Sequence, residues 1–200
     1  MARLRLRDLR DLAVAVLHPR DADGSLMLDQ LKRIGCRTEA HWPPPGALGS
    51  EVDVVFAAIS RDHHADLMRM LRKGGAPSPA VIAVVDYENP AMLQLVLEIE
   101  ALAVVSKPVR PFGILTNLVV AREAWMHMQE LNGKVRKLEN RLVGQKKIAK
   151  AKSILMENQG ITEQVAYRTI RAQAMAKRVP IEEMAVAIIN ANELLSSRIE

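Results

Sequence analysis

The sequence predicts a doubly wound α/β domain followed by a long helix and a small helical bundle. Val-rich apolar runs of strand length alternate with amphipathic segments over the first 121 residues. Continuous apolar strands of this kind are typical of a parallel sheet covered by helices on both faces. A proline-free stretch with heptad spacing comes next, and shorter amphipathic segments complete the chain. We therefore expect an α/β domain at 1–121, a coiled-coil linker at 122–145 and a three-helix bundle at 146–200.

Five strands are expected in the α/β domain, because four apolar runs each end at a polar residue or a proline and a fifth run follows Gly35. They are expected at residues 12–17, 36–42, 52–59, 81–85 and 102–105. The helices between them carry apolar residues at helical spacing and are expected at residues 25–34, 65–71 and 90–99. Functional groups in such a sheet gather at the carboxyl ends of its strands.

The composition excludes several classes of protein. The 200 residues are 49% hydrophobic and 26% charged, as in an ordinary globular protein. The single Cys36 excludes an internal disulfide and a cysteine-rich zinc site, and no glycine-rich phosphate loop is present, so we expect neither a metal nor a cofactor. No apolar run reaches the ~20 residues that span a bilayer, and the first one is too short for a signal peptide. We expect a cytoplasmic protein that does not enter a membrane.

The net charge of +5 lies entirely in the second part of the chain. Residues 1–121 hold 14 basic and 14 acidic side chains, whereas residues 122–200 hold 14 basic and 9 acidic ones. Within 134–152, eight basic residues accompany a single acid, Glu139. Such a segment either contacts a polyanion or forms a solvated helix surface, and charge alone does not separate these two interpretations.

Residues 112–158 contain no proline and predict one long helix with an apolar stripe. The stripe alternates spacings of three and four residues, which is the heptad pattern of a coiled coil. Its members are Met128, Leu131, Val135, Leu138 and Leu142, and the pattern projects backward to Ala124 and Ala121. No second segment of the chain offers a matching long stripe, so we expect a homodimer in which two copies of this helix pair.

Three helices are expected to form the bundle. The long helix should end at Gly160, a residue suited to the left-handed position after a helix. Thr162 is a candidate N-cap for the next helix, with Glu163 in its first turn. Pro180 suits the first turn of the last helix.

The α/β domain resembles a phosphorelay receiver, which has a flavodoxin-like fold, but it lacks the receiver's chemistry. The first strand of a receiver ends in two acidic residues that hold magnesium, where this chain has His18 and Pro19. The phosphoacceptor aspartate after the third strand is replaced by Ala58, and the Ser or Thr after the fourth by Val85. Only Lys107 fits the pattern. Because phosphoryl transfer needs carboxylates for the metal and the nucleophile, we expect a pseudo-receiver that is not phosphorylated.

Residues 145–189 resemble the ANTAR domain, the RNA-binding output module of transcription antitermination regulators. The resemblance is carried by Ala151-Lys152, Leu155-Met156, Gly160 to Glu163, Ala166, Arg171 and Ala174-Met175. The rest of the chain resembles the amidase-operon regulators of this family, through residues 31–36, 42–45, 52–56 and 87–91. The Trp-Pro-Pro-Pro sequence at 42–45 makes this resemblance hard to attribute to the fold alone.

The resemblance implies a protein that binds stem-loops of a nascent leader mRNA and prevents a terminator hairpin from forming. It also implies a dimer that presents two bundles to the RNA. Control is implied through sequestration by an amide-sensing protein of the periplasmic-binding-protein type, rather than through phosphorylation.

If RNA is the ligand, basic helix faces are expected to contact its phosphates. The residues expected to do so are Lys147, Lys150, Lys152, Arg168, Arg171, Lys177 and Arg178. Packing inside the bundle is expected of Ala151, Leu155, Ala166 and Met175. Tyr167, the only aromatic residue of the bundle, either stacks on a base or is buried.

Other interpretations stay open at this point. A DNA-binding regulator and an interaction adaptor with a solvated basic surface are the two alternative classes. An enzyme is not expected, because no nucleophile–base or acid–base set can be assembled. The adjacent histidines within Asp62–Asp66 indicate a surface cluster rather than a metal site, and the loop at 42–45 is either a structural corner or an edge that docks a partner.

Overall fold

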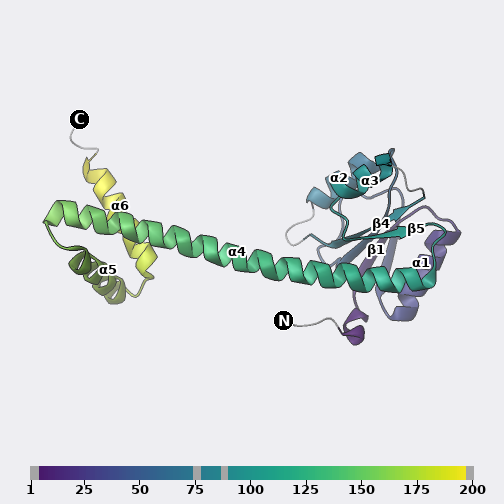
Figure 1. Ribbon diagram of the computed structural model, residues 1–200, viewed down its shortest axis with the longest axis horizontal. Coiled ribbons are helices and arrows are strands. Elements are labelled where there is room, and N and C mark those ends of the chain that lie inside the picture. The colour runs from purple at the N-terminus through teal and green to yellow at the C-terminus, as the bar shows by residue number, and fades with distance from the viewer. Residues whose placement is uncertain (1–4, 74–77, 87–89, 197–200) are drawn as a thin grey trace. The chain divides into compact units, whose positions relative to one another are not determined.

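The computed structural model describes residues 5–73, 78–86 and 90–196 (Figure 1). Contacts within the chain divide it into two compact units, residues 1–130 and 131–200. The helix α4, Pro111–Gln159, contributes its first part to one unit and the remainder to the other. The expected divisions at 121 and 145 stay an interpretation of the sequence.

The first unit contains a five-stranded sheet in which the described strands all pair in parallel. The strands are β1 Ala13–Leu17, β2 Arg37–His41, β3 Val54–Ala58, β4 Ala80–Val85 and β5 Ala103–Ser106. Their order in the sheet is β2-β1-β3-β4-β5, which is the order of flavodoxin-like folds. The five expected strands are confirmed, with ends that differ by at most two residues from the prediction.

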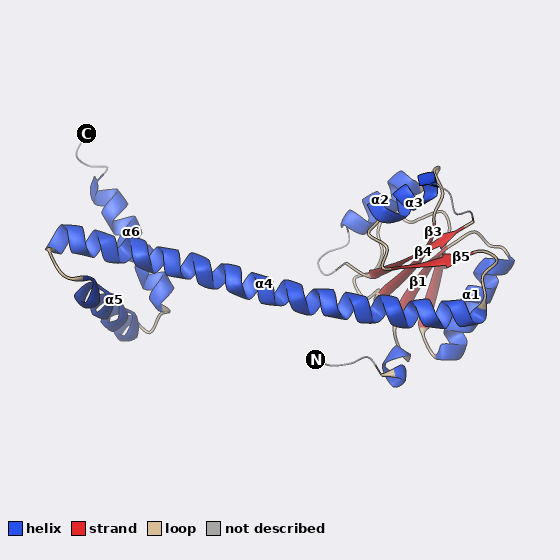
Figure 2. Ribbon diagram, in the orientation of Figure 1, coloured by secondary structure: helices blue, strands red, loops and turns tan. Residues whose placement is uncertain are grey.

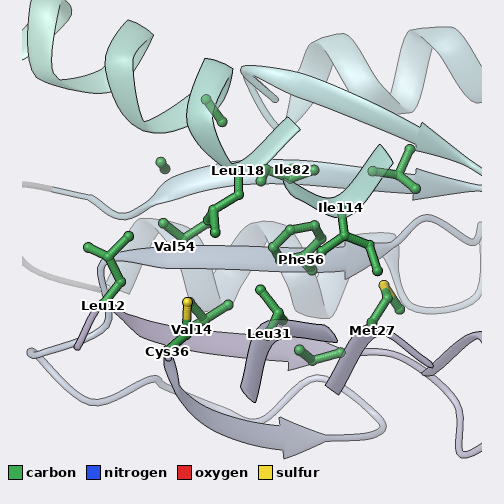
Figure 3. Packing of buried hydrophobic residues seen from close by; sticks show 14 of the residues in the cluster. Leu12, Val14, Met27, Leu31, Cys36, Val54, Phe56, Ile82, Ile114 and Leu118 are labelled. Atoms are coloured by element: carbon green, nitrogen blue, oxygen red, sulfur yellow. The ribbon is translucent and has the colours of Figure 1, made fainter. Parts of the chain in front are cut away.

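Helices cover both faces of this sheet (Figure 2). They are α1 Ala22–Ile34, α2 His64–Lys73, α3 Pro90–Glu98 and the first part of α4. On one face, Phe56 of β3 lies in the same buried cluster as Ile114 and Leu118 of α4 (Figure 3). On the other face, Leu67 of α2 and Val96 of α3 belong to a second cluster. The doubly wound architecture that the sequence predicts is therefore confirmed. A short 3₁₀ helix, η1 Leu6–Leu9, precedes β1 and was not predicted.

Helix α1 begins three residues before its apolar pattern does, because Asp21 caps it. The Asp21 carboxylate accepts a hydrogen bond from the Gly24 N–H at 2.8 Å, which satisfies one of the unpaired donors of the first turn. The helix ends at Gly35, whose φ of 100° is open to glycine and strained for other residues.

The apolar stripe of α4 does not extend backward to Ala121, contrary to the prediction. Ala121 is fully buried and belongs to the same cluster as Ile114 and Leu118, against the sheet. Ala124 is exposed. A heptad pattern cannot distinguish a helix face covered by its own domain from a face that a second copy covers, because both need apolar residues at the same spacing.

The second unit contains the rest of α4 with α5, Glu163–Lys177, and α6, Ile181–Ser196 (Figure 1). Ala151, Ile170 and Ala185 are fully buried in its core. Gly160 adopts φ +63° directly after α4, as expected. Thr162 occupies the N-cap position of α5, but its hydroxyl forms no capping hydrogen bond there. The expected bundle of three helices is confirmed.

Gly133 and Gly144, two glycines in the interior of α4, have different surroundings. A Cβ atom on Gly144 would lie 2.8 Å from Cγ of Glu182 on α6, whereas a Cβ on Gly133 would meet no atom within 4 Å. Gly144 therefore leaves room beside α4 for the side chain of Glu182.

Two further expectations concern membrane-spanning helices and the motif at 87–91. None of the helices among them has both the length and the apolar character needed to cross a membrane. The motif expected at 87–91 includes residues 87–89, which lie outside the described part of the chain.

Candidate functional site

The residues that the resemblance aligns with a receiver's phosphorylation site lie at the carboxyl edge of the sheet. His18 and Pro19 follow β1, Ala58 ends β3, Val85 ends β4 and Lys107 follows β5. Parallel strands bring their carboxyl ends to a single edge, so the fold gathers all five residues there.

The charged groups of this edge pair with one another. His18 is buried, and its Nδ1 donates a hydrogen bond to the Pro19 carbonyl at 2.9 Å and lies 3.3 Å from Asp21 Oδ1. Lys107 Nζ lies 2.7 Å from Asp86 Oδ1. Lys107, the one residue that fits the receiver pattern, is therefore paired with Asp86.

Asp21 is the first acidic residue after β1 in the sequence. Burial raises the pKa of its carboxyl, but the hydrogen bond from Gly24 and the charges of His18 and Lys107 outweigh burial and lower the pKa below its usual value. Ala58 offers only a methyl group at the position of the nucleophile. In the described part of the chain, no three His, Cys, Asp or Glu side chains are grouped so that they could hold a metal ion.

A polar network at the amino edge of the sheet holds α4 at Arg122 and Trp125, and the sequence did not reveal it. Asp53 Oδ2 accepts a hydrogen bond from Ala13 N at 3.0 Å, and Asp53 Oδ1 lies 3.1 Å from the Arg122 guanidinium. Arg122 lies over the ring of Trp125, 4.5 Å from its centroid, and Trp125 Nε1 donates to the Ser78 carbonyl at 2.7 Å. Apart from Arg122 and Trp125, which are three residues apart on α4, these partners are far apart in the sequence, so no local spacing could indicate them.

The histidines of Asp62–Asp66 have separate packing roles. The ring of His63 contacts Trp42 edge-on, with centroids 4.8 Å apart. His64 Nε2 lies 2.8 Å from Glu98 Oε2 on α3. The contact of Trp42 with the residue before α2 favours the interpretation of the 42–45 loop as a structural corner.

The apolar stripe of α4 is uncovered within one chain. Its members are all exposed, from 41% at Met128 to 65% at Leu138, and the others are Leu131, Val135 and Leu142. In the second unit, α5 and α6 pack on the side of α4 that carries Ala151 and Ile154. With about 3.6 residues per turn, that side lies roughly opposite the stripe. The bundle therefore leaves the stripe available to a second helix.

The seven expected RNA-contacting residues do not form one cluster. Lys147 and Lys150, with Lys146, line an open groove of about 390 Å³ between α4 and α6, beside the exposed Val143. Lys150 Nζ lies 2.9 Å from Glu193 Oε1, so this lysine already has an anionic partner.

A second groove, of about 470 Å³, lies between the end of α4 and the start of α5. Its lining residues are Lys152, Glu163, Gln164, Tyr167 and Arg168. Lys152 donates a hydrogen bond to Glu163, and this bond is the main cause that holds the pKa of the Glu163 carboxyl below its usual value. Tyr167 is 43% exposed, so the structure resolves the open choice between exposure and burial in favour of exposure.

The exposed face of α5 continues from this groove along the helix. Tyr167, Arg168, Arg171 and Met175 are spaced by one, three and four residues, which places them on one side of α5. Met175 is 70% exposed, so the expectation that it packs inside the bundle was wrong. The physical reason is that Ala166, Ile170 and Ala174 form the side of α5 that faces the core, and Met175 lies off that side.

The remaining basic and apolar residues of the bundle are also placed. Lys177 and Arg178 are exposed at the end of α5, where Arg178 adopts φ 56°. Ala151 and Ala166 are fully buried and Leu155 packs against the core, as expected.

Comparison with known families matches each part of the chain. The family model described as the N-terminal part of AmiR matches residues 12–122, and the ANTAR domain model matches residues 136–189. An AmiR-type N-terminal domain joined to an ANTAR domain defines the class of the protein, a transcription antitermination regulator.

Individual relatives identify the family within this class. The aliphatic amidase regulator of Pseudomonas aeruginosa is 36% identical over 184 residues, which covers 92% of this chain and 94% of that protein. The chain therefore belongs to the AmiR family of aliphatic amidase regulators. The nitrate regulatory protein of Klebsiella oxytoca is 35% identical over 77 residues, which covers 38% of this chain and 19% of that protein.

A solved receiver structure is also similar. The signal receiver domain of a modulated diguanylate cyclase from Desulfovibrio desulfuricans G20 has a TM-score of 0.47 and 13% identity, and the match covers 59% of this chain and 99% of that domain.

Proposed function

We propose that this protein binds stem-loops of a nascent leader mRNA in the cytoplasm and thereby prevents a terminator hairpin from forming. The observation that carries the proposal is the exposed face of α5, where Tyr167 and Met175 lie beside Arg168 and Arg171 within an ANTAR domain. Cations contact phosphates, and exposed aromatic and apolar side chains contact unstacked bases, which is the combination that loop RNA requires. The seven basic residues expected from the sequence remain the proposed contacts.

We propose that the active form is a homodimer paired through the stripe of α4. A stripe with exposed fractions of 41–65% leaves apolar surface in water unless a second helix covers it. In a parallel pair, heptad positions flanking the stripe would bring Lys134 of one copy toward Glu139 of the other. Glu139 is the single acid in 134–152, so this alignment would place the one acidic side chain of that segment beside a lysine of the partner copy.

Control is proposed to come from sequestration by a ligand-sensing partner of the periplasmic-binding-protein type. The support is chemical, because the carboxyl edge of the sheet has Ala58 in place of a nucleophile and pairs Lys107 with Asp86. Family membership supports the same conclusion, since the P. aeruginosa relative is an aliphatic amidase regulator.

The test of RNA binding is crosslinking of the protein to RNA in cells, followed by sequencing of the bound fragments. The expected result is enrichment of leader regions that can form a stem-loop upstream of a terminator. Purified full-length protein should then raise read-through of that terminator in a transcription reaction. If duplex DNA of the same sequence competes as well as the stem-loop, the RNA antitermination proposal is wrong.

A further inference from the structure

We propose that the groove lined by Lys152, Gln164, Tyr167 and Arg168 holds one unpaired nucleotide of an RNA loop, with its base stacked on the Tyr167 ring. This inference rests on the proposed RNA-binding function and names the ligand of one part of that surface. The groove has a volume of about 470 Å³, within the roughly 300–1,000 Å³ typical of small-molecule sites.

Tyr167 supplies the stacking surface. It is the only aromatic residue between positions 131 and 200. Its side chain is 43% exposed and is not buried in the core of the bundle. Every base has a π-face that stacks on an aromatic ring, but in a duplex that face is covered by neighbouring bases. A single exposed ring therefore fits one base that has left the stack.

The other lining residues supply the remaining contacts of a nucleotide. Lys152 on α4 and Arg168 on α5 are cations on the walls of the groove, where a phosphate next to the stacked base would lie. Gln164 carries an amide, which can both donate a hydrogen bond to a base edge and accept one. The groove between α4 and α6 also has lysines, but its lining contains no aromatic residue.

Glu163 occupies the phosphate position in the free protein. Its carboxylate accepts a hydrogen bond from Lys152, and that bond lowers the pKa of the carboxyl, so the group is ionised at neutral pH. A nucleotide phosphate that binds Lys152 must displace this carboxylate. Glu163 thus weakens binding of polyanions that cannot also place a base on Tyr167.

The test uses the full-length chain and RNA hairpins that share one stem and carry a randomised loop. After selection of a binding hairpin, each loop nucleotide is replaced in turn by an abasic one. With the wild-type protein, one position should weaken binding by about tenfold or more when its base is removed. Tyr167→Ala should show a similar loss with the intact hairpin, and Tyr167→Phe should keep most of the affinity.

Combining Tyr167→Ala with removal of the critical base distinguishes base stacking from a structural role of Tyr167. In Tyr167→Ala, removal of the critical base should have little further effect, because the interaction is already lost. The helix content of the variant, measured by circular dichroism, should equal that of the wild type. If every abasic hairpin loses affinity equally in Tyr167→Ala and in the wild type, Tyr167 does not stack on a base and the inference is wrong, although RNA binding stands.

Glu163→Gln tests the proposed competition between the Glu163 carboxylate and an RNA phosphate for Lys152. Affinity should rise by roughly two- to fivefold, in line with the strength of an exposed ion pair, and the slope of log affinity against log salt should steepen by about 0.7–0.9. Glu157→Gln is the matched control, because Glu157 is exposed and forms no ion pair in the described part of the chain. An equal gain in both variants would overturn the role of Glu163. If the wild type prefers no loop over the bare stem, the proposed function itself fails and the inference with it.

Discussion

At the residue scale, the basic side chains of the bundle differ in whether they already form an ion pair with a carboxylate of the same chain. Lys150 is paired with Glu193 and Lys152 with Glu163, whereas Arg171 is exposed and forms no ion pair in the described residues. A phosphate that binds a paired lysine must first break the existing pair. Sequence alone ranks these residues equally, because the acidic partners come from other helices.

This difference predicts unequal effects of alanine substitution on RNA affinity. Arg171→Ala should weaken binding and flatten the slope of log affinity against log salt by about 0.7–0.9. Lys150→Ala should have a smaller effect on both, since Glu193 already neutralises part of its charge. Arg110→Ala, in the first unit, is the control for net charge and should leave the affinity unchanged. Equal salt slopes for the three variants would show that Arg171 is solvated surface.

Gly24 gives a second prediction at this scale, for the stability of the first unit. A Cβ atom there would lie 2.6 Å from the Pro19 carbonyl oxygen and 3.1 Å from His18 Nδ1, both held in the loop before α1. Gly24→Ala should therefore reduce the free energy of unfolding by about 1–3 kcal/mol, as overpacking does. The control is Gly113→Ala in α4, where a Cβ meets no atom within 4 Å, and stability should rise by up to about 1 kcal/mol. Thermal or urea unfolding of both variants provides the comparison.

At the element scale, α4 has different partners along its length. Its first turns cover the sheet with Ile114, Leu118 and Ala121, and the Asp53–Arg122 pair fixes this part to β1 and β3. Beyond Glu130, the bundle packs on one side and leaves the stripe on the other. One continuous helix therefore presents an intramolecular face first and an unpartnered apolar face later.

The stripe predicts a dimer that charge can disrupt. Leu138→Lys with Leu142→Lys places two cations per chain in the seam, where desolvation and like-charge repulsion oppose pairing. Sedimentation should show a monomer with unchanged helix content in the bundle. Gly133→Lys with Asn140→Lys adds the same charge off the stripe, at exposed positions, and should leave the dimer intact. A double stripe variant that sediments as a full dimer would place the interface elsewhere.

At the scale of the whole molecule, the doubly wound fold brings the charged residues that follow its strands to one edge of the sheet. The carboxyl edge still gathers the ends of four strands, but its acids Asp21 and Asp86 are engaged by His18 and Lys107. The charges of these two acids are therefore compensated by neighbouring side chains at the same edge.

Incubation with a small-molecule phosphodonor and magnesium should leave the intact mass of the protein unchanged. Ala58→Asp alone should not restore phosphorylation, because His18 and Pro19 stand where a receiver has the acids that hold magnesium. A phosphorylatable receiver treated in parallel controls for the reagent. An acid-labile gain of one phosphoryl group on the wild-type chain would contradict the prediction.

The sequence by itself determined the local elements. Apolar runs such as Val81–Val85 form strands wherever they are buried on both faces, and Ala58 offers only a methyl group in any packing. The heptad stripe and the basic excess of the second part were likewise visible as composition and spacing, which depend only on neighbouring residues.

Only the tertiary structure decided which residues meet. It buried Ala121 and exposed Met175, because the choice between two faces of a helix depends on what packs against it. It joined Asp53 to Arg122, Lys150 to Glu193 and Lys152 to Glu163, pairs whose members come from different elements. Distances between such residues are set by the fold as a whole, so periodicity along the chain carries no information about them.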